Sequence, residues 1–347
     1  MNEGSIDQRK IKKGLKYSLL VSVIALGLLF SLTINEETLM KIKRVNSVYL
    51  LLAIVINFLM WVVGGLRIKL ISNALGEKIS LKFAIKNFLV GAFISNITPF
   101  ASGGGPIQVL LLHRKGLSLG KSSTVIIVQF VMRLLFFSIL SPLFFFLFSD
   151  LIDPGMIPEE IFDLLIIFSL SISAIIIYFI WKPDKVKVLT ERLRNLKFLQ
   201  GLMKSKKANQ LIDRLYQEME DFHESLWQLT KYKKSSLLLA AFFTIIFWVL
   251  FFIIAPVILL GLGVKPYFFR SFIVQTIFYL IIPYMPTPGA SGAAEFGFAT
   301  LFSSFVPSSL VGLLAIVWRF LTFYLVIIFG GVILFRMIAK SVLKRTG

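Results

Sequence analysis

Residues 286–295, PTPGASGAAE, interrupt an apolar stretch in the second half of the chain, and residues 99–108, PFASGGGPIQ, interrupt one in the first half. Aligned at their first prolines, the two segments end on Gln108 and Glu295. Unwound backbone is tolerated at membrane depth only where it lines a cavity or is buried in protein, and paired breaks in two halves mark transporter substrate sites. The two segments therefore predict an internal repeat with a substrate site at the breaks.

The composition is that of a polytopic membrane protein. Of the 347 residues, 57% are hydrophobic and 14% are aromatic, which is more than a soluble domain carries. The formal charge of +19 comes mainly from basic residues beside apolar segments, and because the positive-inside rule explains them, we expect no nucleic-acid partner. With no cysteine and only two distant histidines, His113 and His223, we expect no metal and no other cofactor.

Six apolar segments are long enough to cross a hydrocarbon core of about 30 Å, which takes roughly 20 helical residues. They cover about residues 16–34, 47–66, 122–148, 161–181, 236–260 and 309–335. The four apolar pieces around the breaks are shorter, at residues 83–98, 106–113, 272–285 and 292–305. Each pair of short pieces forms either a re-entrant helical hairpin or one broken traverse.

The distribution of charge favours the hairpin. If the first hairpin returns to its own side, Arg67, the basic segment 182–234 and both termini face the cytoplasm, and the acidic loop 150–160 faces outward. The basic loop at residues 41–44 fits less well, because it then lies outside. We therefore expect a multi-pass protein of the cell membrane with both termini in the cytoplasm.

This topology makes the two halves inverted repeats. Residues 1–181 form the first, with its hairpin near 83–115, and residues 236–347 form the second, with its hairpin near 272–305. The expected fold is an all-α polytopic membrane protein whose hairpin tips meet near the midplane. Residues 182–235 form a basic linker with an amphipathic helix, which lies on the anionic inner leaflet or packs against a partner or a second copy.

Three ionisable residues, Arg133, Glu295 and Arg319, fall well inside apolar segments. Since a charge at the bilayer centre costs about 3 kcal/mol on insertion scales, such residues are usually paired or functional. Glu295 either forms an ion pair with one of the arginines or takes up a proton, a cation or a cationic headgroup. Arginine presents a planar fork of donors that suits phosphate. We expect one or both arginines to bind a lipid phosphate, with a helix-to-helix bond as the alternative.

The breaks would also point the N-termini of the following half-helices into the membrane, where free amide groups attract anions. Small and polar residues surround them, and each can instead be structural. Besides the three charged residues, the candidate substrate-binding residues are Asn96, Ser102, Gly103, Gly104, Gly105, Gln108, Pro286, Pro288, Gly289 and Gly292. No arrangement resembles a nucleophile with its base, so we expect no catalytic residues.

At these positions the sequence resembles the membrane domain of lysylphosphatidylglycerol synthase/flippase proteins and their stand-alone flippase-like relatives. The resemblance covers nearly the whole chain and rests on residues 96–106 (NITPFASGGGP), 114–116 (RKG), Arg133 and 286–295. It implies the movement of a lipid between leaflets, such as an aminoacylated phosphatidylglycerol, another anionic phospholipid or a polyisoprenyl-linked sugar. A different inverted-repeat transporter is the alternative at the level of the fold.

In the bifunctional members of that family, a soluble cytoplasmic domain transfers lysine from lysyl-tRNA to phosphatidylglycerol. No such domain has a counterpart in these 347 residues, so we expect a lipid flippase without independent catalysis. The alternative is a phosphatidylglycerol lysyltransferase or a membrane subunit of such a lipid-modifying enzyme. The implied partner is the lipid, and a homo-oligomer or an enzyme partner remains open.

Overall fold

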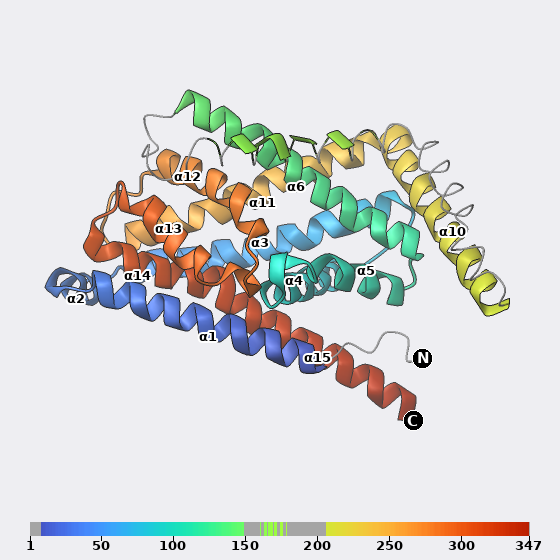
Figure 1. Ribbon diagram of the computed structural model, residues 1–347, viewed down its shortest axis with the longest axis horizontal. Coiled ribbons are helices and arrows are strands. Elements are labelled where there is room, and N and C mark those ends of the chain that lie inside the picture. The colour runs from blue at the N-terminus through green and yellow to red at the C-terminus, as the bar shows by residue number, and fades with distance from the viewer. Residues whose placement is uncertain are drawn as a thin grey trace.

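The computed structural model describes residues 8–148 and 206–346, together with scattered residues between 160 and 178. Every regular element in this part of the chain is helical (Figure 1). The helices are α1 (Gln8–Thr33), α2 (Glu36–Lys43), α3 (Ser47–Ala74), α4 (Leu81–Asn96), α5 (Gly104–Arg114), α6 (Leu119–Leu147), α10 (Lys206–Trp227), α11 (Lys234–Gly261), α12 (Phe268–Ile281), α13 (Ala293–Ser303), α14 (Ser308–Arg319) and α15 (Leu325–Thr346). The expected all-α fold is confirmed.

Short turns of tighter or wider helix join these elements. The 3-10 turns are η1 (Pro99–Ala101), η4 (Ile282–Tyr284) and η5 (Pro288–Ala290), and the π-helical turns are η3 (Gln228–Tyr232) and η6 (Phe320–Tyr324). The loop predicted at 150–160, the start of the linker at 182–205 and most of the span predicted at 161–181 lie outside the described residues.

Five helical segments of the described chain are long and apolar enough to cross a membrane. They are Lys12–Thr33, Ser47–Ala74, Leu119–Leu147, Lys234–Gly261 and Ser308–Ala339, and they correspond to five of the six predicted spans. The last contains η6, so that α14 and α15 form one continuous but irregular segment. These long helices run lengthwise through the molecule in Figure 1, and the shorter helices pack among them.

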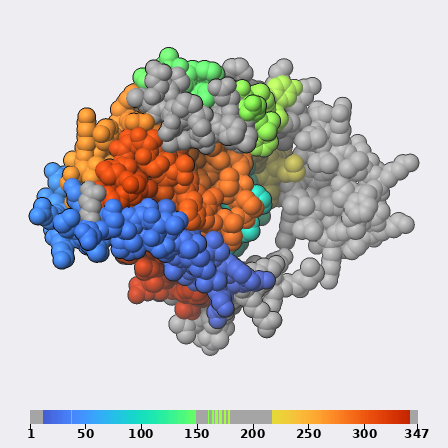
Figure 2. Space-filling view, turned by 60° about the vertical axis from the view of Figure 1, so that its left-hand side comes forward, coloured from blue at the N-terminus to red at the C-terminus, as the bar shows by residue number. Residues whose placement is uncertain are grey.

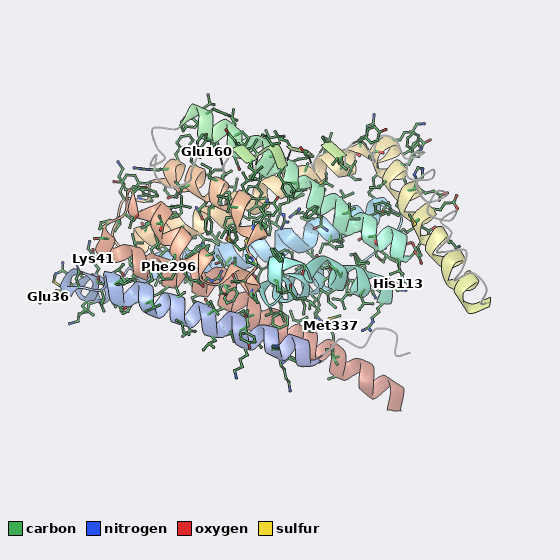
Figure 3. All side chains as sticks on the ribbon, in the orientation of Figure 1. Glu36, Lys41, His113, Glu160, Phe296 and Met337 are labelled. Carbon is green, nitrogen blue, oxygen red and sulfur yellow. The ribbon has the colours of Figure 1, made fainter. Side chains whose placement is uncertain are left out.

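The two glycine-containing breaks interrupt the helices where the sequence predicts them. η1 separates α4 from α5, and η4 and η5 separate α12 from α13. α4 packs against α5, and α12 packs against α13. Glu36 and Lys41 on α2 lie at one end of the molecule and His113 of α5 lies toward the other (Figure 3). The re-entrant form of each pair stays a prediction. The leaflet that each pair enters remains a prediction.

The amphipathic helix expected in the linker is α10, and it packs against α6. The amide of Gly120, near the start of α6, donates to Glu218 Oε2 at 2.7 Å. Leu226 and Leu229 are buried in a cluster with residues of α3, α4 and α6. This end of the linker therefore packs on the protein's own helices.

An aromatic stack fixes α13 against α14. The rings of Phe298 and Trp318 lie nearly parallel, with their centroids 4.1 Å apart, and the Phe302 ring also stacks with Phe298, at 4.3 Å between centroids. All three side chains are buried almost completely. α1 covers the outside of this unit, where Figure 2 shows it lying across the orange and red helices. The second break is thus held between α1, α13 and α14.

Candidate functional site

The two breaks contact each other in the structure. The amide of Phe100 in η1 donates to the carbonyl oxygen of Met285 just before η5, at 3.3 Å. Gly289 in η5 has φ +63°, and a Cβ there would lie 2.7 Å from the carbonyl oxygen of Asn96 and 2.6 Å from the Phe323 ring. Segments almost 190 residues apart in sequence, numbered 99–101 and 288–290, therefore meet through main-chain atoms.

Gly289→Ala is expected to lower the free energy of unfolding by at least about 1–2 kcal/mol, because alanine is strained at this positive φ and its methyl group has no room. Thermal unfolding of the detergent-solubilised protein, followed by tryptophan fluorescence, measures the loss. Gly105→Ala is the control, since the nearest atom to a Cβ there is 3.7 Å away. Equal melting temperatures for the two variants would contradict the close contact between the breaks.

The charged centre of the second break is an ion pair between Glu295 and Arg319. Arg319 Nε donates to Glu295 Oε1 at 2.8 Å, and the two side chains are 6% and 0% exposed. The second carboxylate oxygen accepts from the amide of Gly292 at 2.7 Å, which caps the positive end of α13. Arg319 Nη2 donates to the carbonyl oxygen of Gly289 at 2.8 Å. One buried pair therefore ties α14 to the break and to the start of α13.

Helix α1 completes this centre with residues that the sequence analysis missed. Ser22 donates to Glu295 Oε1 and accepts from the Tyr324 hydroxyl at 3.0 Å. Ser291 donates to the carbonyl oxygen of Ser18 at 3.1 Å. The sequence does contain a signal for this contact. Ser18 and Ser22 are four residues apart, so they share one face of an otherwise apolar helix.

Arg319 is followed directly by the π-helical turn η6. Such turns are rare and often occur at functional sites. A buried side chain from α3 supports this one, since Asn57 Nδ2 donates to the carbonyl oxygen of Leu321 at 3.0 Å. The Arg319 guanidinium also lies over the ring of Phe323, 3.9 Å from its centroid. The sequence pattern does not reveal this irregularity, because the segment reads as a continuous apolar helix.

The first break differs from the second in its contacts. Ser102 is exposed and bonds to its own turn, and the amide of Gly103 donates to the Thr98 hydroxyl at 3.0 Å. Gly104 is buried against Gly91 and Ser95, with no room for a side chain. The contacts described for the first break are therefore hydrogen bonds and close packing between uncharged groups.

Gln108, which aligns with Glu295, does not bond to Arg133 in this structure. Its carbonyl oxygen accepts from Asn87 Nδ2 at 3.0 Å, and its side-chain amide faces the Asn87 carbonyl oxygen. Arg133 instead lies over the ring of Phe130, 5.1 Å from the centroid. Where the second half has an ion pair, the first half has two side-chain amides that each donate to the other residue's main-chain carbonyl, and a separate arginine.

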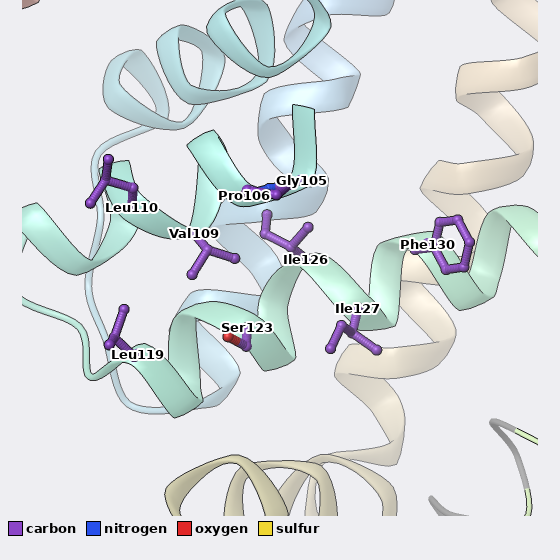
Figure 4. A pocket seen from close by; sticks show the side chains of 9 residues that line it. All are labelled: Gly105, Pro106, Val109, Leu110, Leu119, Ser123, Ile126, Ile127 and Phe130. Atoms are coloured by element: carbon purple, nitrogen blue, oxygen red, sulfur yellow. The ribbon is translucent and has the colours of Figure 1, made fainter. Parts of the chain in front are cut away.

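A cavity of about 530 Å³ opens between α5 and α6 (Figure 4). Almost all of its lining is apolar, apart from Ser123. The lining residues are Gly105, Pro106, Val109, Leu110, Leu119, Ser123, Ile126, Ile127 and Phe130. The lining therefore includes Gly105, next to the first break, and Phe130, whose ring lies beneath the Arg133 guanidinium.

The predicted site residues thus fall into two groups. Gly289, Gly292, Glu295 and Arg319 meet in the buried centre of the second break, with Pro288 in η5 and Pro286 exposed beside it. The other group surrounds the first break, with Gly105 at the cavity and Arg133 further along α6. It consists of Asn96, Ser102, Gly103, Gly104, Gly105, Gln108 and Arg133.

Comparison with known proteins finds relatives that match most of the chain. The chain is 30% identical to a UPF0104 membrane protein of Archaeoglobus fulgidus, over 93% of this chain and 97% of that protein. A UPF0104 membrane protein of Methanocaldococcus jannaschii is 26% identical, over 90% of this chain and 91% of the relative. A UPF0104 membrane protein of Pyrococcus horikoshii is 24% identical, over 87% of this chain and 90% of that protein. No solved structure matches the chain.

One family model matches most of the chain. The family described as "Lysylphosphatidylglycerol synthase TM region" matches residues 17–330. The match begins in α1 and ends in α15, and so includes both breaks and the buried ion pair. The chain is a multi-pass membrane protein that belongs to the lysylphosphatidylglycerol synthase transmembrane-region family.

Proposed function

We propose that the protein is a lipid flippase that moves an anionic or aminoacylated phospholipid, or a polyisoprenyl-linked lipid, between the leaflets of the cell membrane. The observation that carries this proposal is the contact between two broken helices inside an apolar helical bundle, with a buried carboxylate and a buried arginine attached to one break. Unwound backbone and ionisable side chains are costly in a membrane, and they are found where a substrate passes.

In the proposed mechanism, the two breaks separate to open the site first to one leaflet and then to the other. They are the tips of re-entrant hairpins in inverted repeats, and both termini lie in the cytoplasm. One or both of Arg133 and Arg319 attract the lipid phosphate. Glu295 exchanges its bond with Arg319 for a headgroup amine or a coupling proton. Such exchange needs no catalytic residue and no cofactor, and a homo-oligomer or a lipid-modifying partner is compatible with it.

The proposal is tested with purified protein in liposomes that carry fluorescent phosphatidylglycerol, where a membrane-impermeant quencher reports exchange between leaflets. We expect protein-dependent exchange, and Glu295→Gln to reduce it to the rate of protein-free liposomes, because the amide keeps the shape but not the charge. Glu77→Gln is the control, since Glu77 is ion-paired to Lys121 with side chains 30% and 33% exposed. Exchange by Glu295→Gln at the wild-type rate would refute the role of the carboxylate.

A second candidate follows from the family description, which names a synthase. In that case the cavity would present phosphatidylglycerol to a lysyltransferase site. Expression in a host that lacks lysylphosphatidylglycerol, followed by mass spectrometry of its lipids, separates the two candidates. New lysylphosphatidylglycerol would favour the enzyme. Its absence, together with exchange in liposomes, would favour the flippase.

A further inference from the structure

Arg67 of α3 is a buried cation with an unsatisfied donor. The residue is only 6% exposed, and its guanidinium lies over the Phe247 ring, 5.4 Å from the centroid. Its Nε has no hydrogen-bond partner among the described residues. Burial of an unpaired charged donor costs free energy that a folded protein normally recovers through a partner. Arg67 therefore points to an anion from outside the described chain.

A second arginine lies on a helix that packs against α3. Arg133 is on α6, and α3 and α6 are in contact. The ion pairs formed within the described residues use neither arginine. Two like charges in a helical bundle with no described carboxylate beside them favour a bound anion.

The apolar cavity lies beside Arg133. Ile126, Phe130 and Arg133 follow one another at intervals of four and three residues, and so share one face of α6. Ile126 and Phe130 line the cavity (Figure 4), and the Phe130 ring lies beneath the Arg133 guanidinium. An apolar cavity with Arg133 beside one of its lining rings, on a helix that packs against the helix of Arg67, matches a molecule with a hydrocarbon tail and an anionic head.

We propose that Arg67 and Arg133 together bind the phosphodiester of an anionic lipid, and that one acyl chain of this lipid occupies the cavity between α5 and α6. Two guanidinium groups can place four or more donors around the phosphate oxygens. Arg319 is less suited, because Glu295 and the Gly289 carbonyl already occupy its Nε and Nη2. The assignment rests on the proposed lipid transport. It places the lipid headgroup in the first half of the protein, where both arginines lie.

The test measures lipid binding separately from transport. The melting temperature of the detergent-solubilised full chain is followed as phosphatidylglycerol, phosphatidylcholine or inorganic phosphate is added. The variants are Arg67→Gln and Arg133→Gln. The matched control is Arg270→Gln, because Arg270 of α12 also lies over an aromatic ring, that of Phe305, at 4.8 Å.

Phosphatidylglycerol is expected to raise the melting temperature of the wild type and of Arg270→Gln, and phosphatidylcholine much less. In Arg67→Gln and Arg133→Gln, the apparent dissociation constant for phosphatidylglycerol should rise roughly tenfold or more. The lipid-free variants should melt at or above the wild-type temperature, because one of the two like charges is gone. An arginine with a purely structural role would instead lower the melting temperature on substitution.

Three outcomes would overturn the assignment. A wild-type response to phosphatidylglycerol in both arginine variants would place the headgroup elsewhere. An equal response to phosphatidylcholine would show that the phosphate site does not select anionic lipid. A full response to inorganic phosphate alone would replace the lipid by a soluble anion. Each differs from failure of the proposed function, which shows as absent leaflet exchange in liposomes while the binding response persists.

Discussion

Arg319→Met is expected to destabilise the folded protein by about 3–5 kcal/mol, the usual cost of leaving one member of a buried ion pair without its partner. Glu295 is completely buried, and Arg319 supplies the only cation bonded to it among the described residues. Methionine fills a similar volume but donates no hydrogen bond. The loss is measured by thermal and denaturant unfolding of the purified protein in detergent.

The double variant Glu295→Gln/Arg319→Met is expected to recover most of this stability, because no buried charge is left unpaired. It should still fail in the exchange assay if Glu295 serves transport. Lys121→Met is the control, because the pair of Lys121 with Glu77 is partly exposed. It is expected to change the free energy of unfolding by less than about 1 kcal/mol. If Arg319→Met and Lys121→Met lower the free energy of unfolding equally, the Glu295–Arg319 pair is more exposed to water than the structure shows.

A disulfide between Phe100→Cys and Met285→Cys is expected to abolish leaflet exchange, and its reduction to restore it. The two backbones are joined by a hydrogen bond of 3.3 Å between these residues, which brings them within the range that a disulfide can bridge. A covalent link keeps the breaks together, whereas the proposed alternating access requires them to separate. The natural chain has no cysteine, so the engineered pair cannot form a wrong disulfide within the molecule.

The link is verified by mass spectrometry of the intact protein before each exchange measurement. The single variants Phe100→Cys and Met285→Cys are the controls under the same oxidant, and both are expected to keep wild-type exchange. Undiminished exchange by fully cross-linked protein would mean that the breaks stay together during transport. The substrate would then have to pass along another route, such as the cavity between α5 and α6.

Much of the fold could be predicted from the sequence, because hydrophobic length and helix-breaking residues act locally. Five spans and the two breaks follow from runs of apolar residues and from the Gly/Pro segments. The pairing of Glu295 with Arg319 was one of the predicted alternatives, since a charge in an apolar helix needs a partner. These features depend on which residues are present more than on how distant helices pack.

The rest of the site depends on packing between helices far apart in sequence. Ser22 reaches Glu295 because α1 lies across α13 and α14. Arg67 reads as one of the basic residues at the cytoplasmic end of a span, yet it is buried beside Phe247. The side-chain amide of Gln108 donates to the main-chain carbonyl oxygen of Asn87, so the first half does not copy the ion pair of the second. The two similar Gly/Pro segments therefore form breaks that differ in their chemistry.

The joint between the two breaks has a consequence for how the protein responds to its surroundings. The hydrogen bond from Phe100 to Met285 and the close contact of Gly289 with Asn96 involve backbone atoms, which carry no ionisable group. Added salt should not loosen this joint, whereas ion pairs between exposed side chains are screened by it. The resting position of the breaks should therefore be the same in dilute and concentrated buffers.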